Sequence, residues 1–570
     1  MNHTALALTA SLLVGCAGDD GGGATATIGE SSTTGDEATA GTGSSGGVTT
    51  GQDTTTGATT SETTSATTSA TTGEPLTRVE EILGDLGVAM YACPERIWPD
   101  VEASYRASQV LLASKVENTA WVWNFLDGAG EPPVVTEGPL DTLPAEWSAV
   151  FNVGSINGAR TLGISLDWGQ ELNDAFELEN GAPPWPDFTT TLAFHEGFHF
   201  LSSQNDWNVG DGSRTAAYPE PWEPRYLRAQ LQRSLRAEIM EEGAGLGAAA
   251  YWQDRLLTEH AEEMAASRHY DCTEGSAEYV SLMMSALAEL GCDAGDDELL
   301  DLAIEHLDDG VFFTEGSFSP GREFYNLGVV AGLLLRRAGL AGWELGVEDG
   351  EAPVAQLLAG VEVASQEDDA ALQAEVQAAV GERNETVGAE IEPFLEAMAD
   401  PEYTRIPVLF DWVGGSFGVG GFYYLADDPD EREVLLTFSA MMLTPSDVTI
   451  AIDGMTSFNG STTPCVASGG GAIVIAVPTA DLSVVGGTAT STNPKFSFMD
   501  LGVEPTMDDE NLPWLCPTDA GGAKGAPAPE PGLDLGLDLH ILREAGGGSQ
   551  IGVTEALRAL SRPEAAVLRP

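Results

Sequence analysis

Short apolar runs separated by Gly, Pro and Asp predict two groups of β-strands, one in the N-terminal half and one beyond residue 400. The first group comprises residues 109–113, 119–124 and 160–168. The second group comprises residues 406–412, 421–425, 433–438, 448–452 and 472–477. The short spacing of the second group is typical of an antiparallel sandwich. We therefore expect a small N-terminal sheet and a β-sandwich-like C-terminal domain.

Between these strand groups, apolar residues recur with the helical period of about 3.6 residues. The expected helices span residues 76–107 in short pieces, 188–203, 222–268 as one or two helices, 274–290, and most of the chain from there to about residue 400. Asp187 is the expected N-cap of helix 188–203, whereas Thr273 and Gly291 are expected to bound helix 274–290. The pattern predicts an α+β chain, with a mainly helical domain at 76–400 and a β-rich domain at 401–570. A further short helix is expected near residues 553–561.

The N-terminus has the pattern of an export signal. Residues 1–16 form a short apolar segment that ends Leu13-Val14-Gly15-Cys16 and resembles the bacterial lipobox. On that resemblance residues 1–16 are a lipoprotein signal peptide, Cys16 carries the lipid, and the protein is exported to the bacterial outer membrane. No Lys or Arg precedes the apolar run, so an ordinary signal peptide with a chance Cys is the alternative. Residues 17–75 are nearly all Gly, Ser, Thr, Ala and acidic, which predicts a disordered linker.

Charge narrows the possible partners. The 570 residues contain 24 Lys and Arg against 89 Asp and Glu, which gives a formal net charge of −65. We do not expect the protein to bind nucleic acid, because a phosphate backbone requires a basic patch and so few basic residues cannot form one. The acidic surplus also argues against electrostatic docking on anionic lipid. No apolar run is long enough to span a membrane as a helix.

The cysteines predict disulfides in an oxidising compartment. With Cys16 assigned to the lipid, five cysteines remain, and Cys465–Cys516 is the preferred bond. Cys272 and Cys292 flank one predicted helix and should lie too far apart to pair with each other. Cys93 is therefore expected to pair with either of them, leaving the other free.

The candidate chemistry lies in the helix at 188–203, which contains His195-Glu196-Gly197-Phe198-His199. Two His four residues apart lie on one helix face, so both imidazoles can reach one metal ion. Glu196 is rotated from them and can act as general base on water that the metal activates. A zinc site needs a third protein ligand. The longer metalloprotease signature fails because its later positions hold Ser202 and Asn205.

The better third ligand lies in Glu274-Gly-Ser-Ala-Glu278-Tyr279, which resembles the glutamate helix of the gluzincin zinc metallopeptidases, in particular their aminopeptidase-N and glycyl-aminopeptidase branches. The resemblance implies that Glu274 binds zinc, and Glu278, one turn on, would orient a ligand His as a second-shell partner. Glu323-Phe-Tyr325-Asn-Leu-Gly328, followed by an apolar helix, resembles the next family segment, whose Tyr stabilises the oxyanion. That role falls on Tyr325.

Two departures from the family pattern limit the comparison. Glu274 lies 75 positions after His199, a far longer gap than close family members have, so residues 222–268 are interpreted as a helical insertion beside the cleft. The Gly-Ala-Met-Glu-Asn segment that binds a free α-amine is absent, so aminopeptidase specificity is not supported.

The sequence thus predicts a membrane-anchored, zinc-dependent peptidase that acts on a peptide or protein substrate. The alternative is a non-catalytic surface lipoprotein that retains the zincin shell and uses its β-rich domain to bind partners. The oligomeric state stays open. Each candidate site residue also has a purely structural interpretation. The two histidines could simply be buried, Glu274 and Glu278 could form a solvated acidic helix N-terminus, and Tyr325 could be a core residue.

Overall fold

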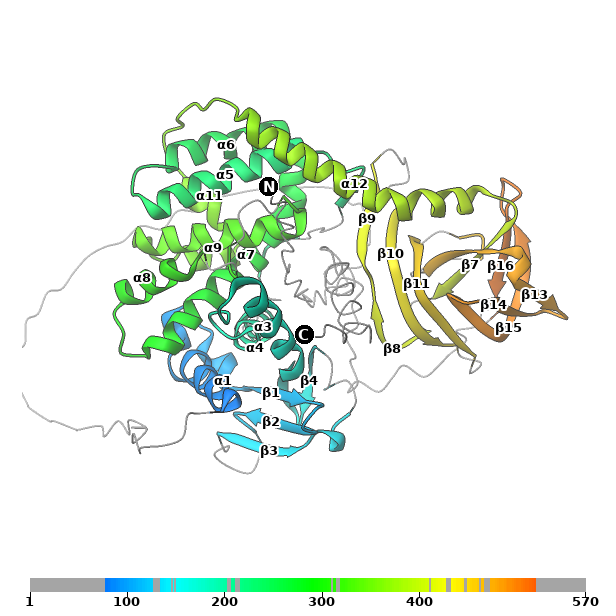
Figure 1. The fold of residues 1–570 in the computed structure, drawn as a ribbon, viewed down its shortest axis with the longest axis horizontal. Helices are drawn as coiled ribbons and strands as arrows, with labels where there is room; N and C mark the ends of the chain where they lie inside the picture. Colours follow the sequence, from blue (N-terminus) through cyan, green and yellow to red (C-terminus); the bar gives the residue numbers. More distant parts are fainter. Residues whose placement is uncertain are drawn as a thin grey trace, which may run out of the picture.

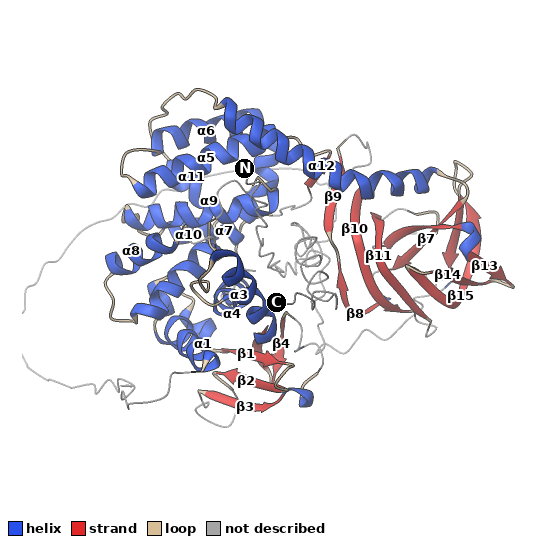
Figure 2. Cartoon of the chain, viewed as in Figure 1, coloured by secondary structure: helices blue, strands red, loops and turns tan. Residues whose placement is uncertain are grey.

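The structure is a computed structural model that describes residues 77–518 except 127–133, 145–146, 148–149, 202–206, 211–215, 309–310, 314–317, 410–411, 427–431, 445–447, 461–462 and 466–471. It has the predicted α+β composition: a five-stranded sheet, a helical body and a large C-terminal sheet (Figures 1 and 2). The predicted signal peptide, lipobox Cys16, linker and helix at 553–561 lie outside the described residues. Among those described, none of the helices is long and apolar enough to cross a bilayer.

The N-terminal sheet has the strand order β3-β2-β1-β5-β4. Its strands are β1 (Ser108–Ser114), β2 (Thr119–Trp123), β3 (Val135–Pro139), β4 (Phe151–Ile156) and β5 (Ala159–Ser165). The first two predicted strands are confirmed as the hairpin β1–β2. The third, predicted to reach residue 168, ends at Ser165 instead, because the Ser165 side chain accepts a hydrogen bond from the Trp168 amide and so caps the next helix.

The helical body contains the elements between the two sheets and three segments near the N-terminus. Its helices are α1 (Arg78–Leu86), α2 (Glu102–Arg106), α3 (Leu166–Asn180), α4 (Phe188–Leu201), α5 (Glu223–Met240), α6 (Leu246–Glu259), α7 (Ala261–Leu290), α8 (Asp296–His306), α9 (Pro320–Arg337), α10 (Trp343–Glu348), α11 (Pro353–Leu358) and α12 (Ala370–Ala399), with a π-helical turn at Gly87–Ala92. One apolar core runs from Ile82 to Val380 and packs these helices against the inner face of the N-terminal sheet.

Helix α7 corrects one prediction. It does not begin at Glu274 behind a Thr273 cap but starts at Ala261 and continues unbroken to Leu290. The Thr273 hydroxyl donates to the His269 carbonyl one turn earlier, 3.0 Å away, so Thr273 lies inside the helix. Gly291, with a φ of 81°, ends the helix as predicted. Glu274 and Glu278 are therefore buried in the middle of a long helix, which rules out a solvated N-terminus for them.

The C-terminal sheet closes on itself. Its strands are β7 (Tyr403–Leu409), β8 (Val413–Gly418), β9 (Gly421–Leu425), β10 (Glu433–Leu443), β11 (Thr449–Gly460), β12 (Ala472–Pro478), β13 (Leu482–Val485), β14 (Thr488–Asn493), β15 (Phe496–Met507) and β16 (Pro513–Pro517), joined at one edge by β6 (Ala216–Tyr218). Strand β15 pairs with β16 on one side and with β11 on the other. The strands β11, β12, β7, β16 and β15 thus form a ring around a separate apolar core.

Two features connect the C-terminal sheet to the helical body. Helix α12 extends from the helical body across the sheet (Figure 1), where Val387, Ile391 and Phe394 pack on a face that includes Val434. Strand β6, which follows α4 in the chain, pairs in parallel with β9. The helical body therefore contributes its own edge strand to the C-terminal sheet.

The predicted disulfide Cys465–Cys516 is present. Of the two partners expected for Cys93, the structure has Cys292, with a Cα–Cα distance of 6.0 Å. Cys272 is a buried free thiol. The Cys93–Cys292 bond joins the segment after α1 to the second residue after α7.

Candidate metal centre

Helix α4 presents the H-E-x-x-H motif inside the protein. Asp187 is its predicted N-cap: the Asp187 carboxylate accepts from the Thr189 amide at 2.7 Å and also pairs with Arg78. His195 and His199 are each 4% exposed and Glu196 is fully buried. Gly197 allows this depth, since a Cβ there would lie 2.6 Å from the Met90 side chain.

Helices α7 and α9 cross at two glycines next to the site. A Cβ on Gly328 would lie 2.1 Å from the Gly275 Cα, and one on Gly275 would lie 2.9 Å from the Gly328 Cα. The backbones can approach this closely because neither residue has a side chain. Glu274 precedes the first glycine and Tyr325 lies three residues before the second, so this crossing brings both predicted site residues to α4. The sequence comparison used Glu274 and Tyr325 but did not assign the packing role of the two glycines.

The structure brings His195, His199 and Glu274 together. The two His Nε2 atoms are 3.2 Å apart, and the Glu274 Oε2 lies 3.2 Å from His195 Nε2 and 3.4 Å from His199 Nε2. Among the residues that the structure describes, this is the one group of three or more His, Cys or carboxylate ligands placed to share an ion.

These separations fit a tetrahedral metal. Ligand atoms at about 2.0–2.2 Å from a tetrahedral ion lie about 3.3–3.6 Å from one another. The three observed separations, 3.2, 3.2 and 3.4 Å, lie inside that range or within about 0.1 Å of its lower end. Two imidazoles and one carboxylate are also the donor set of catalytic zinc sites of the His₂Glu type.

Glu278 orients the first ligand. Its Oε2 lies 3.3 Å from His195 Nδ1, and both side chains are buried. A proton on Nδ1 shared with Glu278 leaves the Nε2 lone pair directed at the centre of the cluster. Burial alone lowers the pKa of His195, but the hydrogen bonds and charges of Glu274 and Glu278 outweigh it and raise this pKa to about 10. The pocket therefore favours positive charge.

Tyr325 lies beside the cluster. Its ring centroid is 5.7 Å from that of His195, and the side chain is 4% exposed. The Arg322 guanidinium lies over the Tyr325 ring, 5.4 Å from its centroid. The aromatic contacts of Tyr325 also include Phe324, so the ring is both part of a small core and next to the metal ligands.

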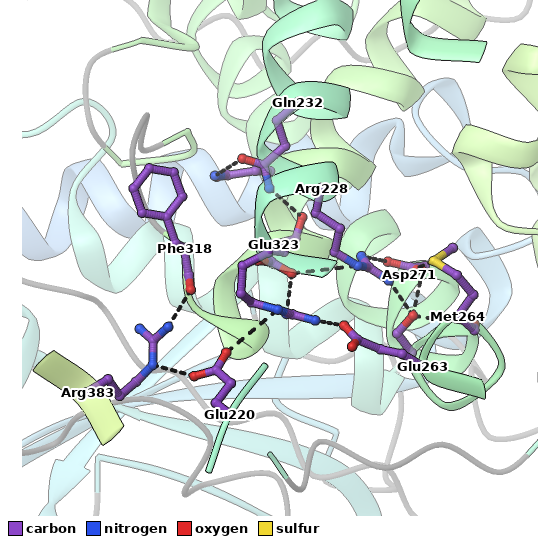
Figure 3. A network of polar contacts seen from close by, with 12 residues as sticks. Glu220, Arg228, Gln232, Glu263, Met264, Asp271, Phe318, Glu323 and Arg383 are labelled. Carbon is purple, nitrogen blue, oxygen red and sulfur yellow. Dashed lines mark hydrogen bonds and ion pairs between the residues drawn. The ribbon is translucent and has the colours of Figure 1, made fainter. Parts of the chain in front are cut away.

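A buried ion-pair network between α5, α7 and α9 was not expected from the sequence (Figure 3). It joins Arg225 and Arg228 of α5 to Glu323 of α9 and Asp271 of α7. The α5 pattern favours an amphipathic helix with solvated arginines, yet Arg225 is 4% and Arg228 1% exposed. The sequence signal for this network was the pair of arginines three residues apart. Such pairs are also common on exposed helices, so the pair did not indicate burial.

Comparison with known proteins adds no family assignment. No protein-family model, no curated protein and no solved structure matches the chain.

Proposed function

We propose that the chain is a zinc-dependent peptidase of the gluzincin type. The observation that carries the proposal is the buried cluster of His195, His199 and Glu274 with tetrahedral spacing, whose two histidines lie on the same helix as Glu196. The donor set fits Zn²⁺. When bound, Zn²⁺ would supply Lewis-acid chemistry by acidifying water and polarising a peptide carbonyl.

The residues of the chain have separate tasks in this reaction. Glu196 accepts the proton of the attacking water and passes it to the leaving amine. Tyr325 donates its hydroxyl proton in a hydrogen bond to the oxyanion that forms on the scissile carbonyl. Glu278 keeps His195 in the tautomer that binds metal. The substrate class follows from the resemblance of the three motifs to gluzincins and is a peptide or protein.

The variant Glu196→Gln tests the mechanism. It preserves shape and leaves the three ligands intact, so we expect one zinc per chain, as in wild type. Hydrolysis of an unstructured protein such as casein should fall by about 10²–10⁴-fold, because the general base is lost. Glu262→Gln, on the exposed start of α7, is the matched control and should retain full activity. Equal rates for Glu196→Gln and wild type would refute the assignment.

A second candidate is a non-catalytic zincin-like protein, and the burial of the site favours it. All three ligands are at most 4% exposed, as in a metal site that only stabilises a fold. The two candidates differ in access. A peptide hydroxamate should inhibit hydrolysis and lower the rate of zinc release if a ligand can reach the ion, whereas a structural site should not respond.

We also propose that Cys16 anchors the protein to the outer membrane through a lipid. The lipobox-like Leu13–Cys16 segment and the linker of residues 17–75 support this. In a Gram-negative host the wild-type protein should sediment with outer membranes, while Cys16→Ala should appear in a soluble fraction with unchanged size of the folded body. Identical fractionation of the two would contradict the anchor.

A further inference from the structure

Arg228 connects the helix of the third metal ligand to the helix of Tyr325. Its Nη1 and Nη2 atoms lie 3.1 and 3.2 Å from the two oxygens of Asp271 on α7, as the dashed lines in Figure 3 mark. Its Nε lies 3.6 Å from Glu323 Oε2 on α9. One rigid guanidinium thus contacts both helices at the same time.

The contacts fall next to the functional residues along the chain. Asp271 precedes Glu274 by three residues, less than one helical turn, and Glu323 precedes Tyr325 by two. Because a helix transmits small shifts along its axis almost rigidly, a change in the spacing between Asp271 and Glu323 moves Glu274 relative to Tyr325. The glycine crossing of α7 and α9 lets the two backbones approach closely, and the ion pairs of Arg228 add polar contacts to both helices.

Further contacts hold Arg228 and Glu323 in place. Arg225 pairs with Glu323 and lies 3.6 Å from Glu220, and Glu220 in turn accepts a 2.7 Å hydrogen bond from Arg383 of α12. The Glu323 backbone carbonyl accepts from Gln232 of α5 at 3.4 Å. The chain of contacts runs from α12 through α5 to both helices of the site.

Stability alone does not account for this network. Replacing buried ion pairs by apolar residues is often neutral or stabilising, because the desolvation of the charges offsets their attraction. What a buried, forked ion pair does provide is a fixed geometry, since any other arrangement leaves a charge unpaired.

We propose that Arg228 is a positioning residue of the metal centre, which fixes Glu274 relative to Tyr325 by holding Asp271 and Glu323 on one guanidinium. This inference rests on the proposed function and deepens it. The segment 222–268, interpreted from the sequence as an insertion beside the cleft, supplies through Arg228 part of the frame of the site.

The variant Arg228→Lys is the first test. Lysine keeps the charge, but its single ammonium group cannot pair with both oxygens of Asp271 and also contact Glu323. We expect one zinc per chain, a KM for a peptide substrate within about twofold of wild type, and a kcat lower by about 10- to 100-fold. Arg255→Lys is the matched control, because Arg255 lies on α6 and pairs with Glu259 of the same helix and with Asp368, just before α12. It should leave kcat unchanged.

Cobalt provides a readout that needs no substrate. With Co²⁺ in place of zinc, the visible absorption bands report the ligand geometry, so Arg228→Lys should shift them and Arg255→Lys should not. The double variant Arg228→Met with Asp271→Leu removes one charge of each sign and leaves Glu323 paired with Arg225, so it should fold and show the same low kcat.

The outcomes separate the possibilities. Wild-type kcat and wild-type cobalt bands in both Arg228 variants would overturn the positioning role. A fall in activity that only follows a fall in folded protein, with unchanged cobalt bands, would also overturn it, because that pattern indicates a purely structural ion pair. If wild type cleaves no peptide, the proposed function fails, and the cobalt bands alone decide the role of Arg228.

Discussion

At the scale of single residues, the site consists of side chains whose chemistry depends on burial. Glu274 and Glu278 each lie within hydrogen-bond distance of His195 in a region that solvent hardly reaches. Glu278 contacts Nδ1, the second ring nitrogen of His195. From this position Glu278 can set the tautomer and the basicity of the ligand His195.

We therefore expect Glu278→Gln to weaken metal binding without abolishing it. The amide is neutral and a weaker acceptor for the Nδ1 proton, so zinc affinity should fall by about 10- to 100-fold. Competition with a fluorescent chelator measures this constant. Glu262→Gln, on the same helix but exposed, should bind zinc as wild type does, and equal affinities for all three proteins would show that Glu278 has no influence on the site.

The residue scale also shows what the sequence could specify. The pair His195 and His199 was predictable because four residues along any α-helix define one face, whatever the rest of the fold. Glu274 required a family resemblance, since it lies 75 positions after His199. Arg228 was not predictable, because only the packing of α5 against α7 and α9 buries its guanidinium.

At the scale of elements, two helix ends were predicted correctly from the sequence and one was not. Asp187 and Gly291 were identified because an Asp N-cap and a left-handed glycine act through local hydrogen bonds and φ angles. Thr273 was misassigned since the same residue type can also donate back to a carbonyl inside a helix. The sequence pattern located eight strands but missed β3, β4, β6, β8 and β13 to β16. It therefore did not predict the pairing of β15 with β11 that closes the ring.

The crossing of α7 and α9 can be tested at Gly328. Gly328→Ala places a methyl group 2.1 Å from the Gly275 Cα, so the helices must separate. We expect a loss of about 1–3 kcal/mol in the free energy of unfolding, measured by urea titration, and reduced hydrolysis as Tyr325 moves from the ligands.

Gly381 in α12 is the matched control for this substitution. It is exposed and a Cβ there meets nothing within 4 Å, so Gly381→Ala should stabilise the protein by about 0.5–1 kcal/mol through helix propensity. Changes of the same sign at both positions would contradict the proposed role of the glycine crossing.

Asp85 in helix α1 makes the stability of the fold depend on pH. Burial first, and then the charges of Glu81, Asp187 and Glu289, raise the pKa of Asp85 to about 6. A carboxyl group whose pKa is higher in the folded than in the unfolded protein destabilises the fold once it ionises, so its cost is absent below about pH 4 and is complete above about pH 6.

Asp85→Asn, which mimics the protonated form, should therefore stabilise the protein above pH 6 by about 1–2 kcal/mol, a range reduced for partial solvent screening. Thermal unfolding from pH 4 to pH 8 measures the difference, which should vanish at the acidic end. Asp254→Asn, at an exposed position of α6, should show no such pH dependence.

At the scale of the whole molecule, the two disulfides close loops of different length. Cys93–Cys292 spans 199 residues and joins the start of the helical body to the end of α7, whereas Cys465–Cys516 spans 51 residues. Cross-links stabilise a fold mainly by restricting the unfolded chain, and they do so more for longer loops.

Replacing Cys93 and Cys292 by Ala should therefore lower the unfolding free energy by about 2–5 kcal/mol, about 1 kcal/mol more than the same replacement at Cys465 and Cys516. Chemical denaturation of the two double variants gives the comparison. A larger loss for the shorter loop would show that native packing, and not chain entropy, determines the effect.

The pairing of β6 with β9 has a consequence for the order of events during synthesis. Strand β6 forms its parallel pairing with residues that leave the ribosome about 200 residues later. At about 5–20 residues per second, β6 is made on the order of 10–40 s before its partner strand. The nascent chain thus carries β6 as an unpaired edge while about 200 of its 570 residues are synthesised, and only the emergence of β9 completes this pairing.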